Sequence, residues 1–93
     1  MSTLYTIPVS GSIELQSLDE LPPLEELQRL VGGYIEYVPG KKNGQVVTVI
    51  VNEEGKLRGL PFNPRATKIY RDFFDDGELT LVGTALIWDG EIR

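Results

Sequence analysis

The stretch from Asn52 to Thr67 restricts the fold of this chain more than any other, because so many of its residues set backbone geometry. Gly55 follows three turn-forming residues and predicts a tight turn in which it takes a positive φ. Leu57–Leu60 then predicts a short strand. Asn63 is a preferred helix-cap residue, and the fixed φ of Pro64 suits the first turn of a helix. The stretch therefore predicts a hairpin, a corner fixed by proline and the start of a helix.

Two helices are predicted from apolar residues that recur with the period of an α-helix. The second helix begins after Asn63, and Asp76-Gly77 predicts its end. Its apolar face consists of Ala66, Ile69, Tyr70, Phe73 and Phe74. The first helix begins at Pro23 and ends at Gly32-Gly33, where one glycine takes the left-handed cap. Each helix has a single apolar face, so each needs an apolar surface to cover.

Alternating or continuous apolar runs predict the other strands. Val46–Val51 is apolar on both faces, which is typical of an interior strand. Pro8 cannot donate a backbone hydrogen bond, so the first strand lies at a sheet edge or ends there. Ser10-Gly11 predicts the turn of an N-terminal hairpin, and residues 39–44 predict a polar loop. The remaining predicted strands are Leu4–Val9, Ser12–Leu15, Tyr34–Val38 and Leu81–Trp88.

The length of 93 residues gives room for one domain, residues 1–93, with a single core. The predicted order of elements is β-β-α-β-β-β-α-β. Two helices with one apolar face each require a flat apolar partner, and the strands supply it. We expect an α+β fold of two layers, in which both helices cover one face of a mostly antiparallel, twisted sheet.

The chain contains no histidine and no cysteine. It therefore lacks the commonest general base, the commonest metal ligand and the thiol nucleophile. Its serines show no G-x-S-x-G elbow. Four carboxylates that are close in sequence could offer oxygen ligands to a hard cation, but their spacing does not match an EF-hand loop, and a solvated helix end explains them. These are Asp72, Asp75, Asp76 and Glu78. We expect no enzyme, no catalytic residue, no cofactor and no metal.

The net charge of −5 disfavours nucleic acid as a partner, because nucleic-acid binding depends on Lys and Arg. The longest branched apolar run is Val46–Val51, whereas a membrane span needs about 20 residues. No basic cluster precedes an apolar stretch near residue 1, so no secretory signal is visible. We expect a cytoplasmic location and no membrane partner.

The best candidate for a binding site is a basic group near the start of the second helix, formed by Lys56, Arg58, Arg65 and Lys68 with Asn63 and Thr67. Backbone N–H groups at the helix start, together with Arg65, could hold a carboxylate or phosphate. The alternative is structural, with Asn63 acting only as a cap and the cations serving solubility. Tyr34 shares the polar face of its strand with Glu36, and an exposed tyrosine there would suit a partner contact.

Two motifs resemble a family of small domains of unknown function, borne mostly by phages, plasmids and other mobile elements. They are Leu27-Gln-Arg-Leu-Val-Gly-Gly-Tyr-Ile-Glu-Tyr-Val38 and Val51-Asn-Glu-Glu-Gly-Lys-Leu-Arg-Gly-Leu-Pro-Phe-Asn-Pro-Arg-Ala-Thr67. Val82-Gly-Thr-Ala-Leu-Ile87 is also similar to the last strand of that family. The resemblance implies an accessory protein made inside an infected or plasmid-bearing cell. It implies no reaction.

The leading hypothesis is a non-catalytic accessory protein of a virus or mobile element, which binds a host protein or complex, or associates with itself. The alternative is an oligomeric sponge that captures an anionic nucleotide signal near Asn63, Arg65 and Lys68 and so counters a host defence. An enzymatic alternative would require a carboxylate metal site at Asp72, Asp75 and Asp76.

Overall fold

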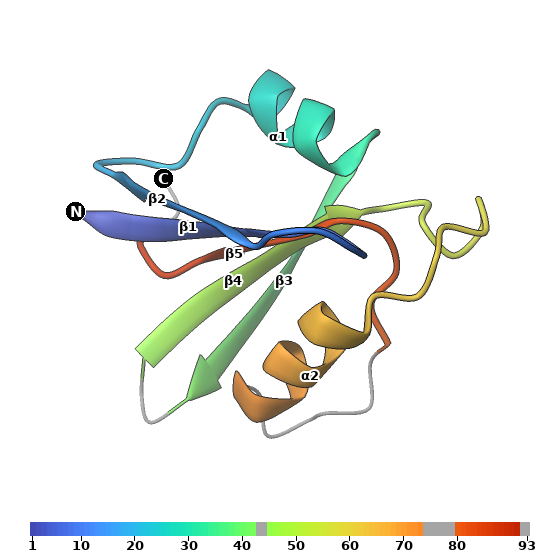
Figure 1. Cartoon of the computed structure of the whole chain (residues 1–93). Helices are drawn as coiled ribbons and strands as arrows, with labels where there is room; N and C mark the ends of the chain where they lie inside the picture. Colours follow the sequence, from blue (N-terminus) through green and yellow to red (C-terminus); the bar gives the residue numbers. More distant parts are fainter. Residues whose placement is uncertain (43–44, 74–79, 92–93) are drawn as a thin grey trace.

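The computed structural model describes residues 1–42, 45–73 and 80–91, which form one sheet and two helices (Figure 1). The strands lie in the order β2-β1-β5-β4-β3, and every neighbouring pair is antiparallel. The last strand of the chain therefore lies in the middle of the sheet. The predicted α+β class with a mostly antiparallel sheet is confirmed. The strands are β1 (Ser2–Ile7), β2 (Glu14–Leu18), β3 (Ile35–Lys42), β4 (Gln45–Asn52) and β5 (Ala85–Trp88).

The two helices, α1 (Leu24–Val31) and α2 (Pro64–Phe73), cover opposite faces of the sheet (Figure 1). Ile50 of β4 belongs to the apolar cluster under α1, whereas its neighbour Val49 belongs to the cluster under α2. Successive side chains of a strand point to opposite faces, so the two clusters lie on the two sides of the sheet. The prediction of two layers with both helices on one face is therefore corrected. The layers are helix, sheet and helix.

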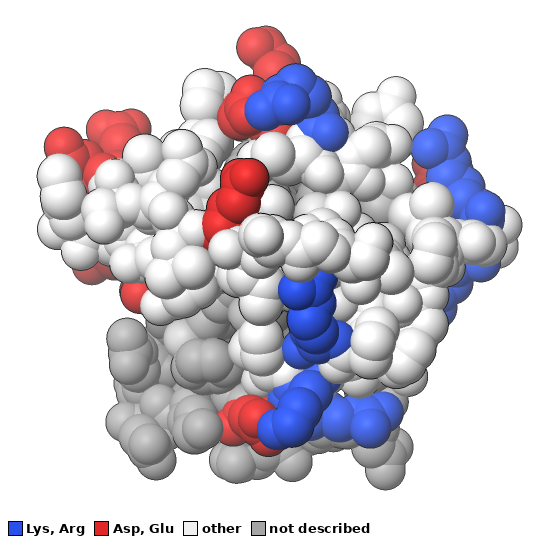
Figure 2. Space-filling model, in the orientation of Figure 1, with Lys and Arg blue, Asp and Glu red and all other residues white. Residues whose placement is uncertain are grey.

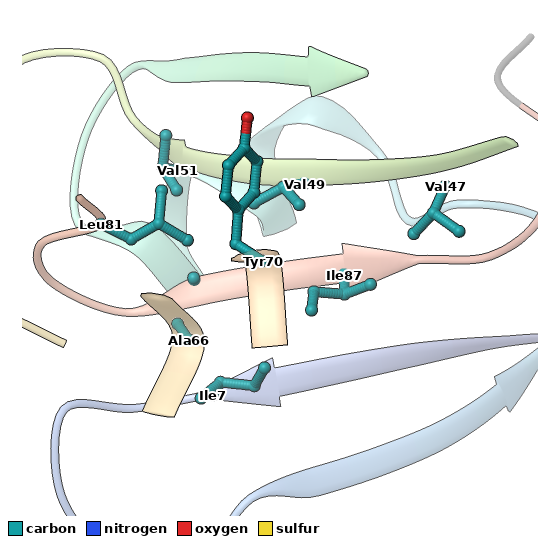
Figure 3. Packing of buried hydrophobic residues seen from close by; sticks show 9 residues of the cluster. Ile7, Val47, Val49, Val51, Ala66, Tyr70, Leu81 and Ile87 are labelled. Carbon is teal, nitrogen blue, oxygen red and sulfur yellow. The ribbon is translucent and has the colours of Figure 1, made fainter. Parts of the chain in front are cut away.

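The helices lie on opposite faces because β4 and β5, in the interior of the sheet, are apolar on both faces. A strand of that kind needs cover on both sides, and a single helical layer leaves one side in water. On the α2 side the buried cluster brings β4 and β5 side chains against Ala66 and Tyr70 (Figure 3). Its members are Ile7, Val47, Val49, Val51, Ala66, Tyr70, Leu81, Ala85 and Ile87. On the α1 side the members are Leu4, Leu27, Val31, Ile50, Leu86 and Trp88.

Helix α1 ends where predicted and begins at Leu24, one residue after the predicted start at Pro23. Pro23 precedes it, and Gly32 closes it in the left-handed conformation with φ of 79°. The backbone N–H groups of Gly32 and Gly33 both donate to the carbonyl of Gln28, at 2.8 and 3.0 Å. These bonds satisfy a carbonyl that the helix itself leaves without a partner. They turn the chain sharply from α1 into β3.

The N-terminal hairpin forms as predicted, although its connection is longer than a two-residue turn. β1 pairs with β2 from Ser2 opposite Leu18 to Thr6 opposite Glu14. β1 ends one residue before Pro8, as expected for a residue that cannot donate to the ladder. The other neighbour of β1 is β5, so β1 is an interior strand and β2 is the edge.

The segment after β4 differs from the prediction of a strand at Leu57–Leu60. Residues 53–59, which we name the β4–α2 turn, form turn structure instead. Arg58 N–H donates to the carbonyl of Glu54 at 2.9 Å, and Leu60 N–H donates to that of Gly55 at 3.0 Å. This is the pattern of one helical turn with a left-handed residue at its end, and that residue is Gly59 (φ 66°) rather than Gly55.

Two further boundaries differ, and a third cannot be compared. β3 continues through the predicted loop as far as Lys42, where it pairs with Gln45. β5 begins at Ala85, later than predicted, and Val82 makes only an isolated bridge to Phe62. The predicted end of the second helix lies outside the described residues.

Candidate functional site

A hollow of about 220 Å³ lies where α1 ends and β4 runs into its turn. Two of the residues predicted to contact a partner, Tyr34 and Arg58, both line it. They are far apart in sequence, and the sheet brings them together because β3 and β4 are adjacent. The complete lining is Gln28, Gly32, Gly33, Tyr34, Asn52, Glu54 and Arg58. We name this feature the α1-end hollow.

Asn52, the last residue of β4, holds the hollow together. Its side chain is buried, and its amide Nδ2 donates to the carbonyl of Val31 at 3.2 Å. Its Oδ1 accepts the N–H of Glu54 at 2.8 Å. One side chain thus ties the end of α1 to the start of the β4–α2 turn. Sequence reasoning placed Asn52 only in a turn, although a polar residue that ends an apolar strand is a signal for such bracing.

Gly33 forms part of the wall and keeps the hollow open. A Cβ at this position would lie 2.8 Å from Nδ2 of Asn52 and 3.5 Å from Nη1 of Arg58. The first distance is closer than real Cβ contacts, so a side chain at Gly33 would displace Asn52. The sequence predicted Gly33 only as part of a helix stop.

The β4–α2 turn also lines a second, smaller hollow of about 140 Å³. Lys56 and Leu57 line it, together with Val82 from the segment before β5. Leu57 has 89% of its surface exposed. The turn is held against the sheet by the N–H of Glu53, which donates to the carbonyl of Tyr34 at 2.8 Å. One short turn therefore presents side chains to both hollows.

Four residues at this end of the molecule are exposed and available to a partner. Tyr34 is 66% exposed, and Lys56, Leu57 and Arg58 all lie on the surface of the turn. Within the described part of the chain, the side chains of Lys56 and Arg58 make no hydrogen bond or ion pair. Lys and Arg atoms extend over the turn at the right of the view in Figure 2. We name Tyr34, Lys56, Leu57 and Arg58 the turn surface.

The side chains of the turn surface are suited to binding a partner. Tyrosine and arginine give large contact areas with a polar end, and both are enriched where partners bind tightly. Carboxylates also lie nearby, Glu54 at the first hollow and Glu36 and Glu53 at the second, so the charge is mixed. Among residues 1–42, 45–73 and 80–91, no three carboxylates gather as ligands for a metal ion. Of the predicted metal ligands, Asp72 pairs with Lys68, and the others lie outside that part of the chain.

Asn63 does not face any surface. It is fully buried, and its Oδ1 accepts the N–H of Ala66 at 3.0 Å, which confirms the predicted helix cap. Its Nδ2 donates to the carbonyls of Ile7 and Gly83, at 2.9 and 2.8 Å. Thr67 is buried as well, and its Oγ1 accepts the N–H of Leu81 at 3.0 Å. Both side chains join α2 to the sheet.

Arg65 and Lys68, the other members of the basic group, are engaged elsewhere. Arg65 donates to the carbonyls of Pro8 and Gly11, at 2.5 and 2.6 Å, and so binds the β1–β2 connection to α2. Lys68 pairs with Asp72 one helical turn away, at 3.1 Å. The start of α2 is therefore not an open cationic surface. The structure separates it from Tyr34 and Arg58, which share the α1-end hollow.

Comparisons with known proteins identify a family. The sequence model described as Domain of unknown function (DUF3846) matches residues 1–91. No curated protein and no solved structure matches the chain. The match confirms the resemblance to a family of small domains of unknown function. Within the described residues, no helix is long and apolar enough to cross a membrane.

Proposed function

Since the chain belongs to the DUF3846 family of domains of unknown function, we propose its role from its own surface: it is a non-catalytic accessory protein that binds a host protein or complex. The observation that carries the proposal is the turn surface, where Tyr34 and Arg58 line one hollow and Leu57 is 89% exposed. Exposed aromatic, apolar and guanidinium groups in one place are typical of binding hot spots. The setting that we propose is the cytoplasm of a cell that carries a virus or mobile element.

The composition supports binding rather than turnover. Without histidine or cysteine the chain has neither the usual general base nor a thiol nucleophile. The buried polar side chains Asn52, Asn63 and Thr67 have hydrogen-bond partners within the fold. They therefore hold the structure together and are not poised for a reaction.

The turn surface is rigid enough to serve as a contact. The β4–α2 turn closes on itself through its own backbone hydrogen bonds, and Asn52 and Tyr34 anchor it at its start. Gly55 lies against the sheet segment before β5, where a Cβ would come 2.9 Å from a methyl of Val82. A loop that is already ordered loses little conformational freedom on binding, which favours affinity.

A second candidate is capture of a small anionic ligand. At Asn63, Arg65 and Lys68 the structure leaves no open surface for the nucleotide site that the sequence suggested. The α1-end hollow, in contrast, is lined by both Arg58 and Tyr34. Glu54 lines the same hollow and repels a polyanion. We therefore place the protein partner first. A thermal-shift screen with cyclic and linear nucleotides separates the two, because only ligand capture raises the melting temperature.

The test of the protein partner is affinity capture from host cells with the chain at its native level, read by quantitative mass spectrometry. We expect a defined set of host proteins with the wild-type chain and loss of that set with Tyr34→Ala/Arg58→Ala. Truncation of one hot-spot residue costs about 2 kcal/mol, or roughly 30-fold in Kd, so the double variant should lose capture.

The matched control is Lys68→Ala/Arg71→Ala, which removes two exposed charged side chains from α2 and should retain the same proteins. Circular dichroism of all variants checks that the fold is kept. Equal capture by both double variants, or no enrichment with the wild-type chain, would contradict the proposal. So would a purified chain that turns over a substrate and loses that activity when one carboxylate is neutralised.

A further inference from the structure

The outer strand β2 is an edge strand that is exposed along nearly its whole length. Four of its five residues are exposed, and Leu15 has 63% of its surface in water. Among the described strands β2 pairs with β1 alone, so none of them bonds the N–H and C=O groups on its outer side. Such an edge is a template for a further strand.

The opposite edge, β3, has the features that proteins use to prevent such pairing. It contains Pro39, which cannot donate, and the charged residues Glu36, Lys41 and Lys42. β2 contains no proline and no lysine, and Glu14 is its one charged residue. Charges and proline on an edge oppose association, so the two edges of this sheet differ in kind.

We propose that β2 pairs with β2 of a second copy, antiparallel about a two-fold axis at Gln16, and so joins the two five-stranded sheets into one. This self-association is independent of the proposed host partner, because it uses the opposite edge of the sheet from the β3 side, where Tyr34 lies.

The register follows from geometry. Residues opposite each other in an antiparallel pair point to the same face of the sheet. A two-fold axis perpendicular to the sheet leaves the α1 faces of the two copies on one side and their α2 faces on the other. Pairing all five residues then sets Gln16 opposite its own copy, Leu15 opposite Ser17 and Glu14 opposite Leu18. Moving the partner by two residues in one direction would set Glu14 opposite Glu20, which like-charge repulsion opposes.

The sequence of β2 favours a second copy of this chain as the partner at this edge. In this register the charged residue of each strand faces an uncharged one, and the two Leu15 side chains become diagonal neighbours across the axis. Two exposed leucines thus leave water together. The net charge of −5 on each chain opposes association at low salt, so the dimer should strengthen as ionic strength rises.

The first experiment measures the mass of the wild-type chain by sedimentation equilibrium at about 100 μM, a concentration that populates complexes with Kd of that order. We expect concentration-dependent dimer and more of it in high salt. Gln16→Glu sets two carboxylates opposite each other and should return the protein to monomer. Lys68→Gln, at an exposed residue of α2, changes the net charge by the same amount and should not. A wild-type chain that stays monomeric, or a dimer that survives Gln16→Glu, overturns the proposal.

The second experiment is cross-linking with single cysteines, which the absence of native cysteine makes clean. Opposite residues of an antiparallel pair have Cα atoms about 4.5–5.5 Å apart, within the range that a disulfide spans. Under mild oxidation Gln16→Cys should therefore form a covalent dimer at least tenfold faster than Leu57→Cys, whose residue is 89% exposed but lies on the turn surface. Equal rates for the two variants overturn the register and the edge together.

Discussion

Single polar residues at the ends of elements determine how this fold is joined. Asn63 shows this most clearly, because one amide caps α2 and also donates to two carbonyls in segments far apart in the sequence. Asn52 plays the same part between α1 and the β4–α2 turn. An amide can do both because it carries donors and an acceptor on one rigid group. Serine or aspartate would serve as a cap but could not brace both carbonyls.

We expect Asn63→Ala to be strongly destabilising. It removes the cap, which contributes about 1 kcal/mol, and takes one donor away from each of two carbonyls, each loss costing about 1 kcal/mol. The total of about 3 kcal/mol is measurable as a lower urea midpoint. Asn63→Asp keeps the acceptor for Ala66 N–H but faces its carboxylate toward the carbonyls of Ile7 and Gly83.

The pH dependence of Asn63→Asp tests this reasoning. Burial against carbonyl oxygens would raise the pKa of the introduced carboxyl, so the variant should regain stability as the pH falls through that pKa. Asn63→Ala has no such group and should not recover. Equal behaviour of the two variants between neutral and mildly acidic pH would show that the cap alone matters.

Side-chain hydrogen bonds connect elements that are distant in the sequence, and the helix or strand propensity of a segment does not predict them. Arg65 lies in the first turn of α2 and reaches the carbonyls of Pro8 and Gly11 in the β1–β2 connection. The helix surface pairs are weaker, as with Glu26 and Arg29 on α1, where hydrogen bonding to Arg29 lowers the pKa of the Glu26 carboxyl. Both groups of that pair are in water, and such pairs contribute little to stability.

We expect Arg65→Ala to cost about 2 kcal/mol, because its hydrogen bonds involve a charged donor and one of them is partly shielded from water. The loss should be local as well as global, with faster amide exchange in residues 8–13. Lys68→Ala is the control, since its exposed pair with Asp72 should contribute about 0.5 kcal/mol or less. Equal melting temperatures for the two variants would contradict the role of Arg65 as a tether.

The molecule as a whole has two apolar clusters that share one sheet. Among the described residues each helix contributes side chains to one cluster, whereas β4 and β5 contribute side chains to both. A small domain buries a limited fraction of its surface, so neither side has much stability of its own. The two sides should therefore unfold together.

We expect Ile50→Val, on the α1 side, and Ile87→Val, on the α2 side, each to cost about 1 kcal/mol and to lower the melting temperature by roughly 4–8 °C. Both side chains are almost fully buried. Unfolding followed by Trp88 fluorescence, which reports on the α1 side, should coincide with unfolding followed by circular dichroism in every variant. Two separate transitions in either variant would show that the sides are independent.

Local chemistry was enough to predict most elements of this chain. The ends of α1, the cap of α2, the interior character of β4 and the break at Pro8 all follow from short-range rules on glycine, proline, asparagine and apolar period. The β4–α2 turn was mispredicted because the short segment Leu57–Leu60 follows a turn signal and was interpreted as a strand partner, although its two leucines are three residues apart. The position of Gly59 at the end of a helical turn depends on backbone hydrogen bonds that no pattern shows.

Long-range arrangement came only from the folded chain. The helices lie on opposite faces because β5, which is last in sequence, inserts between β1 and β4 and makes the centre of the sheet apolar on both sides. The same insertion leaves β2 as a bare edge. The pairing of β3 with β4 brings Tyr34 and Arg58 to the same hollow. The side chains of Asn63 and Arg65 form hydrogen bonds within the fold instead. The apolar period of a segment indicates which of its faces is buried. Which elements become neighbours depends on contacts between segments that are distant in the sequence.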